Sequence, residues 1–409
     1  MNLKFLFAWR YFKAKKTTNA INIIAWISII AIIIGTAALI LVLSVFNGFE
    51  DLVKSLYSSF YPDLKISPIA GKEVVLTQEQ LQKIRSIKGI TAVSLVVEEK
   101  AMLQNGDYQS MINLKGVDQN YTKVTTVADH VVYGEFNTGT EDRPLLVLGA
   151  GIENAVGVQS DRNLFPLTVY LPRKGEVSLS DPFRSLSSDT VNTSGTFIIQ
   201  QDFDNKYVIT NLAFVKRMLG MNPDAYGGAE IATNPNVDAS DIQKQVQKVL
   251  NSNYAVQTRY QQNASLYSVM SMEKWIIYAI LSLILIVAAF NMVGALTMLV
   301  LEKKEDITVL HALGADRSFI KRVFLNEGLL LAVIGGGLGM LLAVIIGILQ
   351  INYHLVPLQG STFMISYFPV KMQWKDFLLV GTTVIVIAVL ASYIPANKAA
   401  NQQFILRSE

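Results

Sequence analysis

Four long apolar stretches dominate the pattern of hydrophobic and polar positions along this chain. They cover about residues 21–46, 275–301, 328–350 and 377–395. Each is long enough to cross a bilayer, because a membrane-spanning helix needs about 20 predominantly apolar residues. The first is too long for the apolar core of a signal peptide, which has about 7–15 residues. The pattern therefore predicts four transmembrane helices.

The region between the first and second apolar stretches alternates short strand-like and helix-like segments. Residues 92–103 and 108–115 have the composition of strands, and Asn105-Gly106 between them is typical of a tight hairpin turn. Thr77 followed by Gln80 forms a capping-box pattern, which predicts a helix start. This region is predicted to be a large α+β domain held between two spans.

The order of these segments favours a further subdivision of the domain. A strand–helix–hairpin order comes early and a strand–helix–strand order comes late, which suggests a split ferredoxin-like part. Residues of about 116–224 would then form a β-rich subdomain inserted into it. Residues 48–60 and 261–273 are predicted to be helical stalks that join the domain to the membrane.

Charge is distributed unevenly and predicts the orientation. Residues 50–271 carry a net charge of −4 and the rest of the chain carries +7. Lys and Arg concentrate in the N-terminal segment, in the polar loop after the second stretch and in the tail, and short basic loops stay in the cytoplasm. We therefore expect both termini in the cytoplasm of a bacterial cell and the large domain outside the inner membrane.

These patterns give a domain assignment. It comprises a cytoplasmic N-terminal segment (1–20), the first span (21–47), a periplasmic domain with stalks (48–271), the second span (272–301), a cytoplasmic loop (302–327), the third span (328–350), a short periplasmic loop (351–376), the fourth span (377–396) and a cytoplasmic tail (397–409).

The sequence lacks the residues and motifs that several kinds of site require. The chain has no cysteine, and the predicted topology puts His311 on one side of the membrane and His130 and His354 on the other. The pattern G-x-x-x-x-G-K-[ST] of a nucleotide-binding loop is missing. The cores of the four stretches hold no charged residue, which argues against an ion-coupled transporter. We therefore expect no catalytic site, no metal and no cofactor, and an energy source supplied by a partner.

Two polar segments stand out. After the second span, a charged run is followed by Ile307, Leu310, Leu313 and then Gly314, which predicts a short amphipathic helix ended by a glycine. Such an exposed helix is suited to docking into a partner's groove. Residues 172–193 are rich in Pro, Gly and Ser and are predicted to be a long loop, either a flexible hairpin tip or an arm that grips a partner.

The chain resembles a known family at both ends. Residues 302–337 resemble the coupling region of MacB/FtsX-type ABC transporter permeases, and the tail from Pro395 to Arg407 is similar to that family's ending. The run L-S-V-F-N-G-F-E at 43–50 resembles permeases of the lipoprotein-releasing Lol type. In the outer domain the resemblance is mainly topological.

The resemblance implies a MacB-like type VII ABC transporter architecture and a set of functional residues. A separate cytoplasmic ATPase would bind ATP and contact the coupling residues Glu302, Lys303, Asp306, Ile307, Leu310, His311, Leu313, Gly314 and Ala315. Acylated lipoprotein would enter a cavity near Val45, Phe46, Asn47, Phe49, Leu266 and Met270, for which ordinary stalk packing is the alternative interpretation. A periplasmic lipoprotein carrier would bind the loop residues Pro172, Arg173, Pro182, Phe183 and Arg184.

The family works as a dimer, so a second copy or a paralogue is implied. The predicted function is ATP-driven, mechanical extraction of lipoproteins from the outer leaflet of the inner membrane and their transfer to the carrier. Two alternatives stay open. One is a MacB-like efflux permease or an FtsX-like regulator of a cell-wall hydrolase, and the other is a membrane-anchored sensor that transports nothing.

Overall fold

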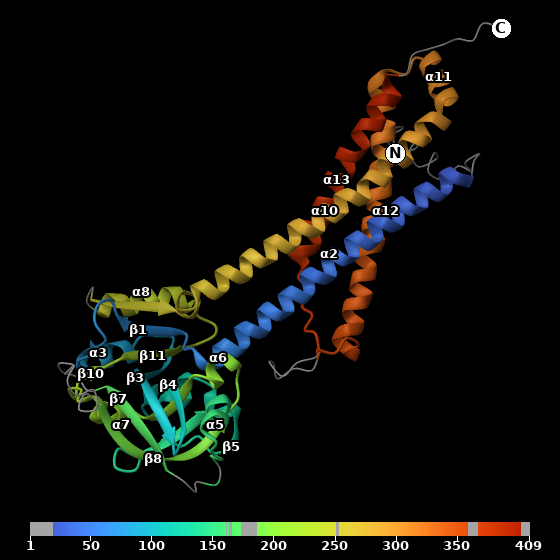
Figure 1. Cartoon of the computed structure of the whole chain (residues 1–409). Helices are drawn as coiled ribbons and strands as arrows, with labels where there is room; N and C mark the ends of the chain where they lie inside the picture. Colours follow the sequence, from blue (N-terminus) through green and yellow to red (C-terminus); the bar gives the residue numbers. More distant parts are fainter. Residues whose placement is uncertain are drawn as a thin grey trace, which may run out of the picture. The chain divides into compact units, whose positions relative to one another are not determined.

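The computed structural model describes residues 19–160, 162, 166–172, 186–250, 253–358 and 367–401. The chain divides into two units (Figure 1), which are considered separately below. The membrane unit comprises residues 1–52, 268–359 and 365–409, and the sheet unit comprises residues 53–267 and 360–364.

Four long helices in the described part of the chain are apolar enough to cross a membrane, as predicted. They are α2 (Asn19–Phe60), α10 (Ala264–Glu302), α12 (Arg317–Tyr353) and α13 (Trp374–Ala400). A short helix, α11 (Lys304–Ala312), lies between α10 and α12. Helix α2 continues without interruption to Phe60, so the predicted stalk after the first span is helical.

Small residues let α12 approach α2 closely. A Cβ atom on Gly335 would lie 2.9 Å from Cγ2 of Ile32, and one on Gly339 would lie 2.6 Å from the carbonyl oxygen of Ile33. These two glycines therefore pack against a neighbouring helix, as their small-xxx-small spacing predicts. The same core includes residues from all the long helices, among them Leu39, Leu43, Leu285, Leu296, Phe324, Leu331, Val380 and Ala396.

The sheet unit is built from short helices and strands. Its helices are α3 (Gln78–Arg85), α4 (Tyr121–Val124), η1 (Val127–His130), α5 (Ala150–Val156), α6 (Gln201–Asp204), α7 (Leu212–Leu219), α8 (Ala239–Val249) and α9 (Arg259–Gln262). Its strands are β1 (Leu64–Pro68), β2 (Val74–Val75), β3 (Ile90–Asn105), β4 (Tyr108–Val117), β5 (Val131–Gly134), β6 (Leu145–Gly149), β7 (Leu167–Pro172), β8 (Leu186–Phe197), β9 (Tyr207–Asn211), β10 (Ala225–Tyr226), β11 (Gly228–Thr233) and β12 (Tyr254–Thr258).

The first part of the sheet unit combines segments from the beginning and the end of its sequence. Strands β12, β1, β11 and β3 lie in that order, and every adjacent pair is antiparallel. Helices α3 and α8 cover this part with Leu81, Ile84, Ile242 and Val246. This is the strand order that a split βαββαβ unit requires, although the ferredoxin-like assignment itself stays a prediction.

The second part is a ring of strands inserted between β3 and β11. Going around it, β3 pairs with β4, β4 with β9, β9 with β6, β6 with β8, β8 with β7, and β7 again with β3. Closure removes free sheet edges within the ring. Its interior is apolar and includes Leu103, Leu114, Leu148, Val169 and Val208.

Local turn and cap signals are confirmed. Residue Asn105 pairs with Tyr108 across a two-residue turn, in which Gly106 has φ +57°. The capping box of Thr77 and Gln80 starts α3.

The prediction that residues 172–193 form a long loop is partly wrong. Pro172 is the last residue of β7, and Leu186–Thr193 belong to β8, in which Leu186–Val191 pair with β7 and the next two residues pair with β6. Val191 and Thr193 are buried there, so this Ser- and Thr-rich segment forms a half-buried strand.

Candidate functional site

The predicted coupling region forms a defined helix at one end of the membrane unit. Helix α10 ends at Glu302, and Lys303 forms an ion pair of 3.1 Å with Asp306 in the first turn of α11. Ile307 is buried in the membrane unit's core. Val309 and Leu313 are 58% and 80% exposed. The helix is therefore anchored through one apolar residue and presents two others outward.

Gly314 ends α11 as the sequence predicts. Its φ is +92°, a conformation that glycine adopts without strain. The amide of Gly314 donates to the carbonyl of His311, and that of Ala315 donates to the carbonyl of Leu310. These bonds close the helix, and Asp316 then caps the start of α12 through the amide of Phe319. The turn fixes the direction in which Leu313 projects.

The run at 43–50 holds the segment that precedes α13. The amide of Lys371 donates to the carbonyl of Ser44. A Cβ atom on Gly48 would lie 2.3 Å from the carbonyl oxygen of Pro369, so only glycine permits this approach. The rings of Phe49 and Phe368 meet edge to face at 5.8 Å. Residues 43–50, the run that resembles Lol-type permeases, therefore form the surface on which residues 368–371 pack.

Asn47 lies at the centre of a buried polar cluster, here called the Asn47 cluster. Its amide nitrogen donates to Asp376 Oδ2 and, at 3.4 Å, to the carbonyl of Lys371. Its amide oxygen accepts from Lys274 Nζ at 2.7 Å. Lys274 Nζ also lies 3.7 Å from Asp376 Oδ1. The cluster joins α2, α10 and α13, and Asn47 and Asp376 are only 1% and 4% exposed.

The sequence interpretation missed Lys274, Lys371 and Asp376. A signal was present, since Lys274 and Asp376 have opposite charges and each lies within two residues of the tryptophan at the end of its apolar stretch. The resemblance assigns Asn47 to a lipoprotein cavity, which stays a prediction. In the structure its side chain bonds to three other residues.

An apolar pocket lies beside this cluster in the membrane unit. Its volume is about 340 Å³, within the range of small-molecule sites. Helices α2 and α12 and the segments around 355 and 369 form its walls. The lining residues are Leu41, Val42, Val45, Ile346, Gly347, Gln350, Leu355, Val356, Phe368 and Val370. Gln350 braces the wall, because its side chain bonds to both backbone groups of Val356 and to the carbonyl of Phe368.

The structure brings only some of the predicted cavity residues together. Val45 lines the apolar pocket, and Phe49 packs on Phe368. Phe46 and Met270 are half-buried in the membrane unit. Leu266 belongs to the sheet unit, so no single groove that contains all six residues is described.

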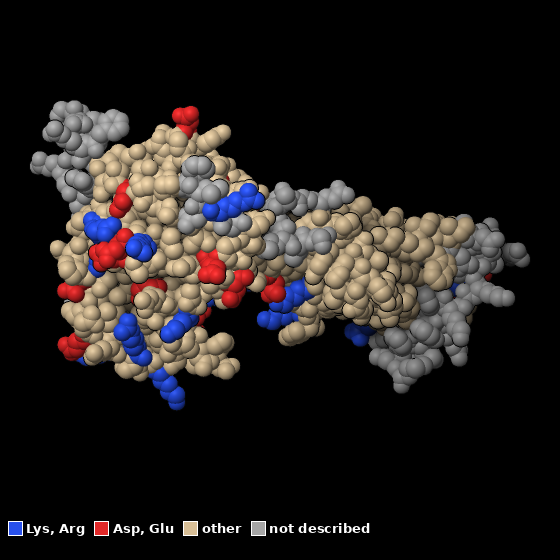
Figure 2. All heavy atoms as spheres, turned by 90° about the horizontal axis from the view of Figure 1, so that it is seen from below, with Lys and Arg blue, Asp and Glu red and all other residues tan. Residues whose placement is uncertain are grey.

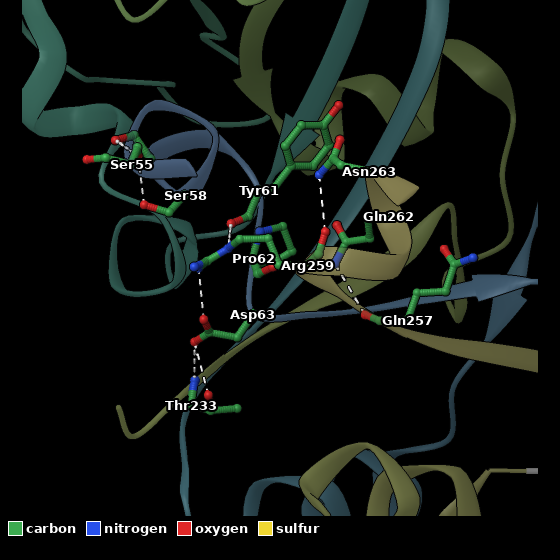
Figure 3. Close-up of polar contacts among 11 residues, drawn as sticks. Ser55, Ser58, Tyr61, Pro62, Asp63, Thr233, Gln257, Arg259, Gln262 and Asn263 are labelled. Carbon is green, nitrogen blue, oxygen red and sulfur yellow. Dashed lines mark hydrogen bonds and ion pairs between the residues drawn. The ribbon is translucent and has the colours of Figure 1, made fainter. Parts of the chain in front are cut away.

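In the sheet unit, the chain leaving α2 is tied to β11 and to the segment before α10 (Figure 3). Arg259 donates to the carbonyl of Tyr61 and forms an ion pair of 2.8 Å with Asp63. Asp63 also accepts from the amide and the hydroxyl of Thr233. Gln262 donates to the carbonyl of Pro62. The two chain segments that lead to α2 and α10 are therefore bonded directly to each other.

A buried ion pair lies under the last residue of α2. Lys115 on β4 and Glu230 on β11 are 2.7 Å apart, with side chains only 2% and 1% exposed. The Lys115 ammonium lies 4.8 Å from the ring centres of both Phe60 and Tyr121. Burial alone would lower the pKa of Lys115, but the Glu230 carboxylate and the Tyr121 and Glu98 side chains outweigh it and raise that pKa. Lys115 is therefore held charged.

The surface of the chain separates charged from apolar regions. In Figure 2, Lys, Arg, Asp and Glu are spread over the sheet unit, whereas the helical surface of the membrane unit is largely without them.

Of the predicted carrier-loop residues, Pro172 ends β7, and Arg173, Pro182, Phe183 and Arg184 lie outside the described residues. Among the described residues, no group of three His, Asp or Glu side chains is placed to hold a metal ion.

Two family models match the sequence. The model of the MacB-like periplasmic core domain matches residues 25–249, more than half of the chain. The model of the FtsX-like permease C-terminal region matches residues 278–404, which include α11, α12, α13 and most of α10. The chain belongs to the MacB/FtsX-like permease family. It is accordingly an inner-membrane protein with a periplasmic domain, and the predicted fold class is confirmed at this level.

Full-length relatives of this permease are also found. It is 27% identical to the lipoprotein-releasing system transmembrane protein LolE of Haemophilus influenzae, over 98% of each chain. It is 25% identical to LolC of Neisseria meningitidis serogroup B, over 97% of each chain. Among solved structures, the periplasmic region of MacB from Actinobacillus actinomycetemcomitans matches with a TM-score of 0.37 and 11% identity, over 53% of this chain and 98% of that one.

Proposed function

We propose that this permease is the transmembrane subunit of an ABC transporter that extracts lipoproteins from the outer leaflet of the inner membrane and releases them to a periplasmic carrier. The observation that carries this proposal is the similarity to LolE and LolC over almost the entire length of all three chains. That similarity covers both the periplasmic domain and the membrane helices, whereas a shared domain alone would leave the cargo open.

The exposed face of α11 supports a separate ATPase partner. Val309 and Leu313 are apolar, strongly exposed and held on a helix with a fixed end. A groove on a cytoplasmic ATPase suits such a helix. The chain itself lacks a phosphate-binding loop sequence. ATP would therefore be bound by the partner, and α11 would transmit its closure to α10 and α12. This assignment places both termini of the permease in the cytoplasm.

The membrane unit offers a place for acyl chains. The pocket at Val45 and Phe368 is lined almost entirely by carbon. Moving an acyl chain out of the bilayer costs about 0.8 kcal/mol per CH₂ group, so a multiply acylated protein does not leave unaided. An apolar site on the permease lowers this cost, and ATP hydrolysis supplies the rest.

The connections in the sheet unit suit mechanical transmission. The bonds of Arg259 to Tyr61 and Asp63, and the Lys115–Glu230 pair beneath Phe60, fix the ends of the stalks to the sheet. A displacement of α2 or α10 would therefore move the attached strands as well. The proposed transporter also includes a second permease copy or a paralogue, with which this chain forms a dimer, and a periplasmic carrier that binds the released lipoprotein.

A reconstituted system tests this function. The permease is inserted into vesicles with its ATPase and a fluorescent triacylated lipoprotein, and ATP-dependent transfer to a soluble carrier is measured. We expect release of the acylated protein only. Transport of the unacylated protein would instead favour an efflux permease. ATPase binding without any release would favour a regulator.

Leu313→Asp tests the docking surface. A buried charge at the interface should weaken ATPase binding by at least about tenfold and abolish release, without reducing insertion of the permease. The control is Val75→Asp, which replaces an exposed apolar residue of the sheet unit. Normal ATPase affinity in the Leu313 variant would contradict the assignment of α11.

A further inference from the structure

The pairing of β3 is interrupted along one of its two sides. On the side of β4 it is continuous from Val96 to Asn105. On the other side, β11 pairs with β3 as far as Val96, and β7 pairs with it only from Met102 onward. None of the described strands pairs with residues 97–101 on that side. These five residues therefore have a strand neighbour on the side of β4 alone.

The orientation of the main chain follows from the hairpin between β3 and β4. Asn105 and Tyr108 face each other across a two-residue turn and form a hydrogen-bonded pair. Alternate residues of a strand direct their N–H and C=O groups to opposite sides. Counting back from Asn105, the main-chain groups of Glu98 and Lys100 point away from β4, toward the interruption.

The two strands that flank the interruption cannot fill it completely. If the register of β7 is continued, Pro172 faces Lys100. A proline has no amide hydrogen, so it cannot donate to the carbonyl of that lysine. At the other end, the amide of Gly227 donates to the carbonyl of Val96, where the pairing with β11 stops.

Two cavities adjoin at the interruption. The larger has a volume of about 420 Å³ and is lined by Val96 and Lys100, among others. The smaller has a volume of about 160 Å³ and is lined by Val97. Because successive side chains of a strand point to opposite faces, the cavities lie mainly on opposite faces of β3. Four residues line both cavities, namely Lys72, Glu98, Glu99 and Gly227. The cavities therefore meet where the neighbouring strand is missing.

The wall of the larger cavity contains one cation that is not neutralised. Lys72 forms an ion pair of 2.8 Å with Glu99, and Nζ of Lys65 lies 3.9 Å from the Glu98 carboxylate. Lys100 is exposed and forms no ion pair with any residue that the structure describes. An acidic group is therefore the complementary partner at this position.

We propose that residues 97–101 and the two adjoining cavities form a site, here called the β3 opening, that binds an extended segment of the cargo polypeptide. Main-chain groups of the segment pair with Glu98 and Lys100, in the manner of an added strand, and an acidic side chain lies against Lys100. Val96 and Met102 are separated by about 20 Å along the strand, which leaves room for about three extended residues between the flanking strand ends. The rest of the segment lies in the cavities. This inference rests on the proposed function, which brings a polypeptide to the periplasmic domain.

Photocrosslinking tests the β3 opening in the reconstituted transporter. p-Benzoylphenylalanine replaces Ser67, on the wall of the larger cavity that β1 forms, or Lys123, an exposed control position on α4. After illumination with bound triacylated lipoprotein, we expect a crosslink to the lipoprotein from position 67 and none from position 123. Mass spectrometry should place the crosslink in an unfolded segment of the lipoprotein. No crosslink from position 67, or one only to the carrier or to residues 173–185 of the permease, would overturn the proposal.

A charge reversal tests the role of Lys100. Lys100→Glu should lower the crosslinked fraction from position 67 at least about threefold, because it replaces an attraction to the acidic side chain by a repulsion. Lys123→Glu is the matched control and should leave that fraction unchanged. An unchanged fraction in the Lys100 variant would contradict the proposal.

Proline substitutions in the lipoprotein test the pairing of main chains. Two alternate residues of the crosslinked segment are replaced by proline, which removes their amide hydrogens, or by alanine. We expect the proline variant alone to lose the crosslink, and equal crosslinking of both variants would refute strand addition. The two proposals can also fail separately. A crosslink without ATP-dependent release would refute only the proposed function, and release without a crosslink from position 67 would refute only the β3 opening.

Discussion

Lys115 shows how a charged residue can be retained inside a folded domain. Its ammonium is paired with Glu230 and faces the rings of Phe60 and Tyr121, so its lost hydration is replaced on several sides. Oε2 of Glu230 has no hydrogen-bond donor within the described part of the chain. Such a pair contributes little net stability compared with apolar residues of the same size. It does require β4, β11 and the end of α2 to meet in one arrangement.

Removing one partner of the Lys115–Glu230 pair should lower the free energy of unfolding more than removing both. Lys115→Met leaves a buried carboxylate without its cation, and we expect the free energy of unfolding to fall by about 3–5 kcal/mol. Lys115→Met combined with Glu230→Leu should lose distinctly less. Urea unfolding followed by circular dichroism measures both. Equal losses in the single and double variants would show that packing, and not the uncompensated charge, dominates.

Asp204 makes stability depend on pH. Burial raises its pKa to about 6 from an ordinary value of 3.8, against the opposing effect of the amides of Ile199 and Gln200, which donate to it. Because the folded carboxyl binds a proton more tightly than the unfolded one, its contribution to stability is full below about pH 4. That contribution is lost as the pH rises to about 6. Asp204→Asn should therefore gain stability relative to the wild type between pH 4 and 7. A difference independent of pH would contradict this.

At the scale of elements, the contact between α2 and α12 depends on two glycines of α12, Gly335 and Gly339, that face α2. Gly339→Val should insert a side chain where Ile33 and Thr36 leave no room. We expect a loss of about 1–3 kcal/mol, as for other overpacked cores. Gly337→Val is the matched control, because a Cβ atom there meets nothing within 4 Å. Thermal unfolding in detergent compares the two. Equal melting temperatures would mean that the helices separate easily.

The sequence predicted the secondary-structure elements better than it predicted the contacts between residues far apart in the chain. Apolar length identified four helices, and the Asn105-Gly106 turn and the capping box at Thr77 were right because these signals are local. The strand at Leu186–Thr193 was missed because Ser, Thr and Asp outnumber its apolar residues, and its strand character is evident only from its pairing with β7 and β6. The Asn47–Asp376 contact joins residues far apart in the sequence, so no local pattern could reveal it.

At the scale of the whole molecule, the charge distribution predicts a membrane topology that can be tested. The segment that holds β4 and the segment that holds α11 should lie on opposite sides of the membrane. In this cysteine-free chain, Tyr108→Cys should react with an impermeant maleimide in intact spheroplasts. Glu305→Cys should react only after permeabilisation. Labelling of both positions from the same side would contradict the assigned orientation.

The pairing of β1 has a consequence for biosynthesis. This strand is complete at Pro68, yet its two neighbours are β11 and β12, which end at Thr233 and Thr258. A ribosome adds about 5–20 residues per second, so both edges of β1 stay unpaired for about 8–33 s, and the edge that pairs with β12 stays unpaired for about 10–40 s. During that interval the nascent domain presents a ready template for aggregation outside the membrane. Chaperones in that compartment should therefore be most important before the last strand has emerged.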